Sequence, residues 1–418
     1  MSSLTNDPTQ VDSWEIVLLR AAAAMSLSEP QYATIERRYT RLGEIFDAAT
    51  HPLLRDANIF VQGSIGLRTT NKPAPGATGE MATIDADAVV WLPHAGSATA
   101  MEVLDAVEAR VVDGSRVDRK IQKLRRGVRI VYADESPGFH IDVTPARCAP
   151  GNSDCDGHGY LLVPDRALGW KCSSPRTYNS WLASVAAGQI RIVDYDALIA
   201  KRVYFAEAKQ EPIPAYSEYI DGNPLRAAIK LLKRHRDMWA IGRDKASVRP
   251  ISAILTTLAG LAYADVAKES QYVDFRAIDA IIAIVERLPK YIAHNAYAGY
   301  SVLNPTDQGE NFAEKWNRPN GEGKRYVEAF YEWHAVAVHD LRMGQRDLGS
   351  AAAFSSSMNE AYGVSKTLVE EVVDALPRNW TLPGRKAGVS ANALSLGILT
   401  GDPMPPSQSS IVPVRRLG

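Results

Sequence analysis

The sequence has little cysteine, almost no net charge and no long hydrophobic run. Three cysteines in 418 residues indicate a reducing compartment and exclude a disulfide-based scaffold. The 47 Lys and Arg residues nearly balance the 48 Asp and Glu residues, whereas proteins that grip long nucleic acid through its phosphates are usually far more basic. The most apolar stretches, 251–267 and 277–288, are interrupted by charged residues, and no basic flank precedes an apolar run at the N-terminus. We therefore expect a cytoplasmic protein with no membrane segment and no requirement for long nucleic acid.

Hydrophobic residues make up 46% of the chain and charged residues 23%. These values are close to the average for soluble globular proteins. At roughly 100–200 residues per domain, a chain of this length is expected to form two or three units.

Local patterns divide the chain into three parts and predict the α+β class. Residues 12–50 have helical periodicity, with a capped helix start at Ser28. Residues 59–145 contain four short strands rich in Val and Ile, and a helix at about 98–112 separates two of them. From Asn223, which has the features of an N-cap, the pattern is helical almost to residue 376. The expected units are residues 1–200, residues 201–382 and a flexible tail at 383–418, which is rich in Pro, Gly and Ser.

Three acidic side chains and a Gly-Ser pair lie in the strand-rich part. Asp85 and Asp87 occupy alternate positions of one strand, so they point to the same face. Asp142 lies on a second strand, and Gly63-Ser64 follows a third. Three clustered carboxylates repel one another unless divalent cations relieve the charge, and Mg²⁺ prefers oxygen ligands. The pattern favours phosphoryl-transfer chemistry at paired metal ions; the alternative is a solvated edge strand.

The motifs resemble those of nucleotidyltransferases related to DNA polymerase β. More closely, they resemble the bacterial CD-NTases, which are relatives of cGAS and of the Vibrio dinucleotide cyclase and belong to cyclic-oligonucleotide antiphage systems. The resemblance covers about residues 60–320 and is carried by VQGSIGLRTT, IDADAVVWL, HIDVTPA, LKRHRDMW, RPISAIL and NPTDQGENFAEKW. It implies a nucleotidyltransferase core with a mixed sheet, and a C-terminal helical lobe that closes over the active-site cleft.

The resemblance also implies roles for the acidic residues. Asp85 and Asp87 would hold two Mg²⁺ ions, for which Mn²⁺ could substitute. Asp142 would ligate the ion that activates the acceptor hydroxyl and would help to deprotonate that hydroxyl. Gly63 and Ser64 would hold the donor triphosphate.

The helical part supplies two further candidates by the same resemblance. Lys233 and Ser252 match positions that contact the triphosphate, where an ammonium and a hydroxyl stabilise developing charge. The alternatives are a solvated helix residue for Lys233 and a helix cap for Ser252. The segment 71–83 departs from the family pattern as a Pro- and Gly-containing insert, expected to be a mobile rim. Ala253 stands where some relatives have an aromatic residue, so the sequence names no residue that stacks on a base.

The function expected from this resemblance is synthesis of a cyclic oligonucleotide from NTPs, with release of pyrophosphate, in antiphage defence. Purine substrates, GTP and/or ATP, and a cyclic dinucleotide product are favoured. The alternatives are another nucleotidyltransferase of the superfamily, modifying a small molecule, an RNA end or a protein, and a nucleotide-binding pseudoenzyme. The sequence does not fix the base, the 2′ or 3′ linkage or the ring size.

Three other signals are weaker. The basic segment 116–129 is expected to form a solvated helix leading into a strand. The chain ends in VPVRRLG, which resembles a ubiquitin-like terminus, so Gly418 is a candidate for conjugation by a ubiquitin-transfer-like enzyme; the alternative is a frayed end. A structural zinc site could be built from the cysteines and a nearby histidine, but ordinary reduced thiols are favoured over it because the spacing matches no standard pattern. These residues are Cys148, Cys155, His158 and Cys172.

Overall fold

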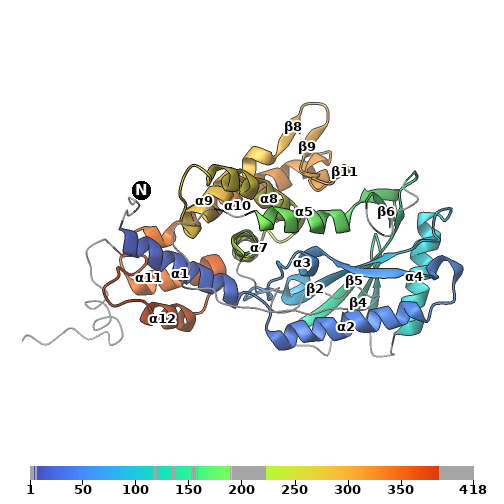
Figure 1. The fold of residues 1–418 in the computed structure, drawn as a ribbon, viewed down its shortest axis with the longest axis horizontal. Coiled ribbons are helices and arrows are strands. Elements are labelled where there is room, and N and C mark those ends of the chain that lie inside the picture. Colours follow the sequence, from blue (N-terminus) through green and yellow to red (C-terminus); the bar gives the residue numbers. More distant parts are fainter. Residues whose placement is uncertain are drawn as a thin grey trace, which may run out of the picture.

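The computed structural model describes residues 4, 7–115, 120–132, 137–151, 157, 159–188, 190 and 223–385. Two N-terminal helices begin the fold, α1 (Pro8–Ala24) and α2 (Glu29–Asp47). The α2 start at Ser28 is confirmed, because Ser28 and Gln31 form a reciprocal capping box. Figure 1 shows that α1 lies among the helices at one end of the molecule, whereas α2 lies along the sheet at the other.

A mixed sheet forms the second lobe, as the sequence predicts. Its central path is β1-β2-β5-β4-β3, in which β2 and β5 are parallel and the other pairs are antiparallel. The end of β5 pairs antiparallel with β6, which in turn pairs antiparallel with β7. The strands are β1 (Asn58–Gln62), β2 (Thr83–Trp91), β3 (Lys120–Lys123), β4 (Val128–Tyr132), β5 (Gly138–Cys148), β6 (Leu161–Asp165) and β7 (Gly169–Ser173).

Alternation along the strands gives this sheet an apolar face and a polar face. On β2, Ile84 and Ala86 belong to the apolar core that packs against α2 and α4 (Ala100–Gly114). On β5, Ile141 and Val143 belong to the same core. Because successive strand residues point to opposite faces, the intervening residues of β2 and β5 face the other lobe. The short helix α3 (Gly63–Gly66) follows β1 on that polar side.

The remaining helices form a helical lobe around one hydrophobic core. That core joins α1 and α5 to the C-terminal helices; the boundaries at 200 and 382 remain predictions. The helices are α5 (Pro175–Ala187), α7 (Pro224–Gly242), α8 (Ser252–Glu269), α9 (Ala277–Arg287), α10 (Glu322–Leu341), α11 (Ala351–Tyr362) and α12 (Lys366–Asp374). Asn223 caps α7 as expected, since its side chain accepts from two backbone N–H groups.

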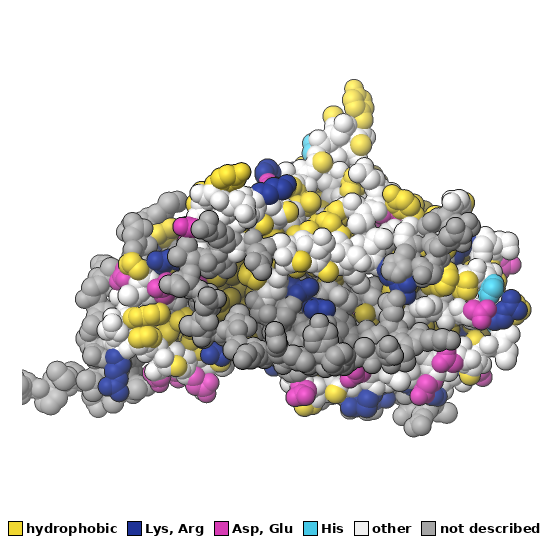
Figure 2. Space-filling model, in the orientation of Figure 1, with side chains coloured by type: hydrophobic (Ala, Val, Ile, Leu, Met, Phe, Trp, Pro, Cys, Tyr) yellow, Lys and Arg dark blue, Asp and Glu magenta, His cyan; other side chains and the backbone are white. Residues whose placement is uncertain are grey.

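Two hairpins and five 3₁₀ turns complete the described fold. The hairpin β8–β9 projects from the helical lobe with hydrophobic side chains at its tip (Figure 2). The strands are β8 (Ala293–Asn295), β9 (Gly299–Ser301), β10 (Leu303–Asn304) and β11 (Asp307–Asn311). The 3₁₀ turns are η1 (Pro52–Leu54), η2 (Gly79–Ala82), η3 (Leu288–Tyr291), η4 (Glu314–Asn317) and η5 (Met343–Gln345).

Two local predictions are wrong. The described part of the basic segment 116–129 is no helix, because residues 120–123 form β3 and pair with β4 across a tight connection. The continuous helical pattern at 359–376 is divided into α11 and α12. Gly363 ends α11 with a left-handed φ of 63°, and Ser365 caps α12 by accepting from the Leu368 N–H.

Several expectations fall wholly or partly outside the described residues. The tail from residue 386, with Gly418, is outside them, as are Cys155 and His158. Cys148 is disulfide-bonded, so the expectation of a reduced thiol is wrong there, whereas Cys172 is a free thiol. Within the described ranges, no helix is long and apolar enough to cross a membrane.

Candidate active site

The register of two parallel strands brings the predicted acidic residues together. Asp87 lies opposite Asp142, and Asp85 lies opposite His140. Ligand atoms of Asp85, His140 and Asp142 lie within 4.8 Å of one another, a spacing that suits a metal ion. His140 was not predicted as a site residue, although it precedes Asp142 by two residues and therefore shares its face.

An arginine on the neighbouring strand holds Asp142. Arg129 lies opposite Asp142 in the β4–β5 register. Its Nε donates to Asp142 Oδ1 at 2.6 Å and its Nη2 donates to Oδ2 at 2.8 Å. Arg129 Nη1 also donates to Glu80 at 2.7 Å. Asp142 is therefore tied into a two-pronged ion pair, while Asp85 is 54% exposed and contacts His140 Nε2 at 2.8 Å.

Gly63 lies directly against the Asp87 carboxylate. Its φ is +59°, and a Cβ placed there would lie 2.0 Å from Asp87 Oδ2. Only glycine meets both conditions without strain, because L-residues rarely adopt this backbone conformation. The next residue, Ser64, accepts a hydrogen bond from Thr70 Oγ1 at 2.9 Å. The Gly-Ser pair and the acidic strand thus form one continuous surface.

The charges on this surface fit a divalent cation. Burial raises the pKa of Asp87 well above its usual range, and the Asp85 and Asp142 carboxylates raise it further. Burial also raises the pKa of Asp142, although the hydrogen bonds from Arg129 oppose the rise. Carboxylates that raise one another's pKa carry unrelieved negative charge, which a bound cation removes. Oxygen donors suit Mg²⁺ or Mn²⁺, and the imidazole of His140 adds one nitrogen donor.

Cationic side chains on the helical lobe face this acidic surface. Lys233 of α7 is 8% exposed, and its Nζ donates to the Thr69 carbonyl at 2.9 Å. Burial, together with the neighbouring Arg236, lowers the pKa of Lys233 to about 8. Burial and Arg236 also lower the pKa of Arg249. Cations that lower one another's pKa create a site for an anion.

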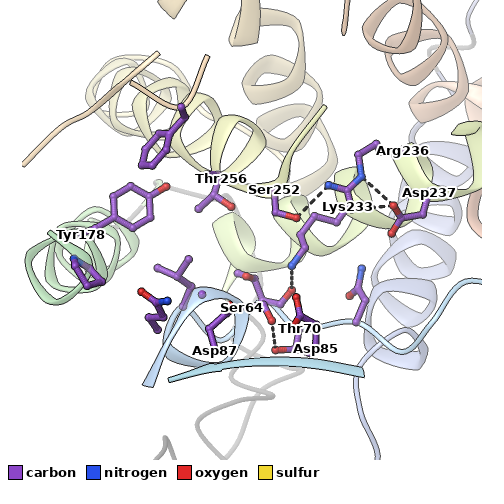
Figure 3. Close-up of a pocket in the computed structure, with 18 of the residues that line it drawn as sticks. Ser64, Thr70, Asp85, Asp87, Tyr178, Lys233, Arg236, Asp237, Ser252 and Thr256 are labelled. Atoms are coloured by element: carbon purple, nitrogen blue, oxygen red, sulfur yellow. Dashed lines mark hydrogen bonds and ion pairs between the residues drawn. The ribbon is translucent and has the colours of Figure 1, made fainter. Parts of the chain in front are cut away.

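Ser252 is the first residue of α8 and is fixed by an arginine. Arg236 Nη1 donates to Ser252 Oγ and to the Pro250 carbonyl, each at 3.0 Å. Arg236 also pairs with Asp237 at 2.8 Å. Figure 3 shows Lys233 and Ser252 opposite Ser64 and Asp85 across the pocket. Ser252 is therefore both a helix-start residue and a lining residue of the cleft.

One cleft of about 400 Å³ contains six of the seven predicted site residues. The described residues that line the cleft do not include Asp142. The six that do line it are Gly63, Ser64, Asp85, Asp87, Lys233 and Ser252. The insert 71–83 contributes to the rim. Its beginning is hydrogen-bonded to α7, because Asn71 Nδ2 donates to the Lys230 carbonyl at 2.8 Å and Arg234 Nη2 donates to the Lys72 carbonyl at 2.7 Å.

Comparisons with known proteins identify the fold. No protein-family model and no curated protein matched the sequence. The structure is similar to that of the Bradyrhizobium diazoefficiens CD-NTase CdnG in complex with GTP, with 20% identity, coverage of 87% of this chain and 98% of that one, and a TM-score of 0.60. The chain has the CD-NTase fold.

The fold expected from the sequence motifs is thereby confirmed. Lower similarity links the chain to Vibrio cholerae DncV in its GTP-bound form, with 16% identity, coverage of 86% and 88%, and a TM-score of 0.48. For Escherichia coli DncV bound to 3′-deoxy GTP, the identity is 15%, the coverage 85% and 88%, and the TM-score 0.47. The CD-NTase fold places the sheet and helical lobes on opposite sides of the cleft described above.

Most of the other cleft residues were not predicted from the sequence. Arg236 and Arg249 lie inside the quoted motifs, so their proximity to Lys233 and Ser252 was a usable signal. Glu310 and Phe312 also lie inside a quoted motif, NPTDQGENFAEKW, but no spacing rule could place them beside Tyr178, because the two segments are more than 100 residues apart.

Proposed function

We propose that this protein is a metal-dependent nucleotidyltransferase that joins NTPs into a cyclic oligonucleotide with release of pyrophosphate. The observation that carries the proposal is one cleft whose sheet side is acidic and whose helical side is cationic. A metal–triphosphate complex has both charges that such a cleft complements. The similar CdnG structure contains GTP, which supports NTPs as the substrate class.

The proposed roles follow from the positions of the side chains. Asp85, Asp87 and Asp142 would hold two Mg²⁺ ions, with His140 beside them, and Asp142 would accept the proton of the attacking hydroxyl. Bound ions would neutralise charge on the reacting phosphate and lower the pKa of the attacking hydroxyl. Gly63 allows the backbone to approach the triphosphate, and Ser64 offers it a hydroxyl. Each role remains a proposal.

Lys233 and Ser252 would hold the triphosphate from the helical side. Lys233 is preorganised by the Thr69 carbonyl, and Ser252 by Arg236. Fixed donors of this kind stabilise the charge that develops as pyrophosphate leaves, without reorganisation at the moment of reaction. Two successive transfers in one cleft would then close the ring. A role in antiphage defence and a cytoplasmic location belong to the same proposal.

The decisive test is incubation with labelled NTPs and Mg²⁺ and no other acceptor. We expect pyrophosphate release and a phosphatase-resistant product, whose bases and linkages mass spectrometry with nuclease P1 digestion would identify. Product formation only after addition of a small molecule, an RNA end or a protein would instead support a different transferase. Nucleotide binding without any turnover would support a pseudoenzyme.

A further inference from the structure

His140 is buried inside the acidic cluster with one ring nitrogen facing a carboxylate. The residue lies on β5 opposite Asp85 of β2, and it is 4% exposed. Its Nε2 lies 2.8 Å from Asp85 Oδ1, yet Nε2 makes no hydrogen bond within the described part of the chain. Burial of a polar atom without a hydrogen bond costs free energy. The Nε2 atom is therefore aimed into the cluster without the partner that its burial requires.

The second ring nitrogen of His140 shows which tautomer is present. Nδ1 lies 3.0 Å from Thr83 Oγ1, and Thr83 Oγ1 donates to the Glu80 carbonyl at 2.8 Å. A hydroxyl has one proton and a carbonyl oxygen only accepts, so Thr83 has to accept from His140 Nδ1–H. In the neutral ring, Nε2 then carries a lone pair. Metal-bound histidines have this arrangement, in which the other ring nitrogen donates to a protein acceptor.

The spacing of the facing atoms fits a shared ion. Ligand atoms of Asp85, His140 and Asp142 lie within 4.8 Å of one another. Neighbouring ligand atoms of an octahedral ion with bonds of about 2.1 Å are about 3 Å apart, close to the separation of His140 Nε2 and Asp85 Oδ1. A nitrogen lone pair and a carboxylate oxygen repel each other at this distance, and an ion that binds both atoms removes the repulsion.

The 3₁₀ turn η2 supports two members of the cluster at once. The Glu80 carbonyl accepts from Thr83, and the Glu80 carboxylate accepts from Arg129. Arg129 in turn donates to both oxygens of Asp142. An ionised carboxylate has about four acceptor positions, so Asp142 keeps capacity for an ion while Arg129 fixes its orientation. The imidazole of His140 and the carboxylate of Asp142 are thus both held in place from the same turn.

We propose that His140 Nε2 is a ligand of the metal ion held by Asp85 and Asp142, and that this position therefore favours a first-row transition-metal cation over Mg²⁺. The inference rests on the proposed function and specifies the donor set and the class of ion at one metal position. Mg²⁺ prefers oxygen donors, whereas the affinity of a site with a nitrogen donor rises from Mn²⁺ through Fe²⁺ to Co²⁺. Thr83 is a positioning residue, because it acts on the ion only through Nδ1.

Pulsed electron paramagnetic resonance with Mn²⁺ alone tests the proposal on the wild-type protein. Less than one equivalent of Mn²⁺ is added, and protein labelled with ¹⁵N in histidine is compared with unlabelled protein. A histidine nitrogen bound to Mn²⁺ modulates the electron spin echo, and we expect the label to change the modulation frequency. Mn²⁺ bound without a histidine-nitrogen signal overturns the proposal and leaves His140 as a doubly protonated ring paired with Asp85.

The His140→Gln variant should lose this signal. Its Mn²⁺ affinity should fall at least about tenfold, whereas Mg²⁺ affinity, measured by competition, should change less. His94→Gln is the matched control, because His94 pairs with Asp56 outside the cluster at 2.8 Å. A nitrogen signal that persists in His140→Gln, or that disappears in His94→Gln, overturns the proposal. If His140→Gln fails to fold, the labelled wild-type protein decides alone.

Two variants of Thr83 test the fixed tautomer. Thr83→Val cannot accept from Nδ1–H, so its Mn²⁺ affinity should fall about tenfold with His140 still present. Thr83→Ser keeps the hydroxyl and should restore the affinity. Unchanged Mn²⁺ affinity in the valine variant, or an equal loss in the serine variant, overturns the role of Thr83.

The same preparations separate this inference from the proposed function. Wild-type protein that binds Mn²⁺ through oxygen alone and joins NTPs refutes the role of His140 and leaves nucleotidyl transfer standing. A histidine-nitrogen signal in a protein that releases no pyrophosphate with any cation supports the ligand and refutes the proposed function. Wild-type protein that binds no Mn²⁺ refutes both.

Discussion

The two sides of the cleft carry opposite charge and are positioned by different means. On the sheet side, the β2–β5 register alone fixes Asp87 opposite Asp142. On the helical side, Lys233 and Ser252 come from separate helices and depend on hydrogen bonds to Thr69 and Arg236. A strand register is set within one lobe, whereas the helical side is oriented partly by contacts across the cleft. The acidic side is thus positioned within one lobe, whereas the position of Lys233 depends in part on how the two lobes dock.

The acidic side should give the largest effect when it is changed. In Asp85→Asn with Asp87→Asn, we expect product formation to fall at least about 10³-fold, because the groups proposed to hold the ions are lost. Metal-free NTP binding should be retained or strengthened, since two charges that repel a triphosphate are removed. The midpoint of thermal unfolding should stay equal or rise, because Asp87 no longer contributes an unrelieved charge.

The measurements are pyrophosphate release, calorimetric binding and thermal unfolding of the same preparations. Asp113→Asn is the control, because Asp113 is exposed on α4 and, among the described residues, forms an ion pair with Arg110 alone. Product formation that survives in the double variant would remove the acidic side from the reaction and with it the proposed function.

Disrupting the contact between the Gly63-Ser64 turn and the acidic strand β2 should give the next largest loss of activity. Gly63→Ala combines a φ of +59° with a Cβ 2.0 Å from Asp87 Oδ2. We expect activity to fall about 100-fold, since displacement of a catalytic group by about 1 Å costs that much. Gly79→Ala is matched for backbone strain, because Gly79 has a φ of +58° and open space around its Cβ position.

The two alanine variants therefore separate the effect of backbone strain from the effect of a steric clash with Asp87. Each should lose about 1 kcal/mol of unfolding free energy through the left-handed backbone, but only Gly63→Ala should also lose turnover. Equal activity losses in the two variants would mean that the contact between residue 63 and Asp87 does not contribute to activity.

The sheet side of the cleft could be predicted from the sequence because its functional residues lie close together along the chain. Asp85 and Asp87 share a face by strand alternation, and Gly63 precedes them at the end of an apolar strand. The failure at 120–123 has a physical reason as well. Basic residues occur in solvated helices and on edge strands alike, and pairing with β4, a tertiary contact, decides between them.

The end of the cleft lined by Ser173 and Glu310 could not be predicted, because it is assembled across the chain. Ser173 lies on β7, and Glu310 lies on a strand of the helical lobe. Only the docking of these two strands places their side chains within hydrogen-bond distance. Cys148 likewise belongs to a disulfide that composition argued against. Sequence spacing informs most about sites built on adjacent strands and least about sites built between lobes.

A pH dependence on the cationic side should give the smallest effect. Burial lowers the pKa of Lys233 to about 8, so its ammonium is charged below pH 8 and progressively neutral above it. Triphosphate binding favours the charged form, so metal-free affinity should be highest below pH 8 and fall as pH rises, by at most about tenfold per pH unit.

In Lys233→Arg, the guanidinium stays protonated, so affinity should be nearly flat between about pH 7.5 and 9. Calorimetry of a non-hydrolysable NTP without divalent ions measures this directly, because the arginine variant shares any titration of the sheet side with the wild type. A wild-type profile as flat as that of the arginine variant would show that Lys233 does not bind the triphosphate, and Ser252 with the arginines would be left to form the cationic side.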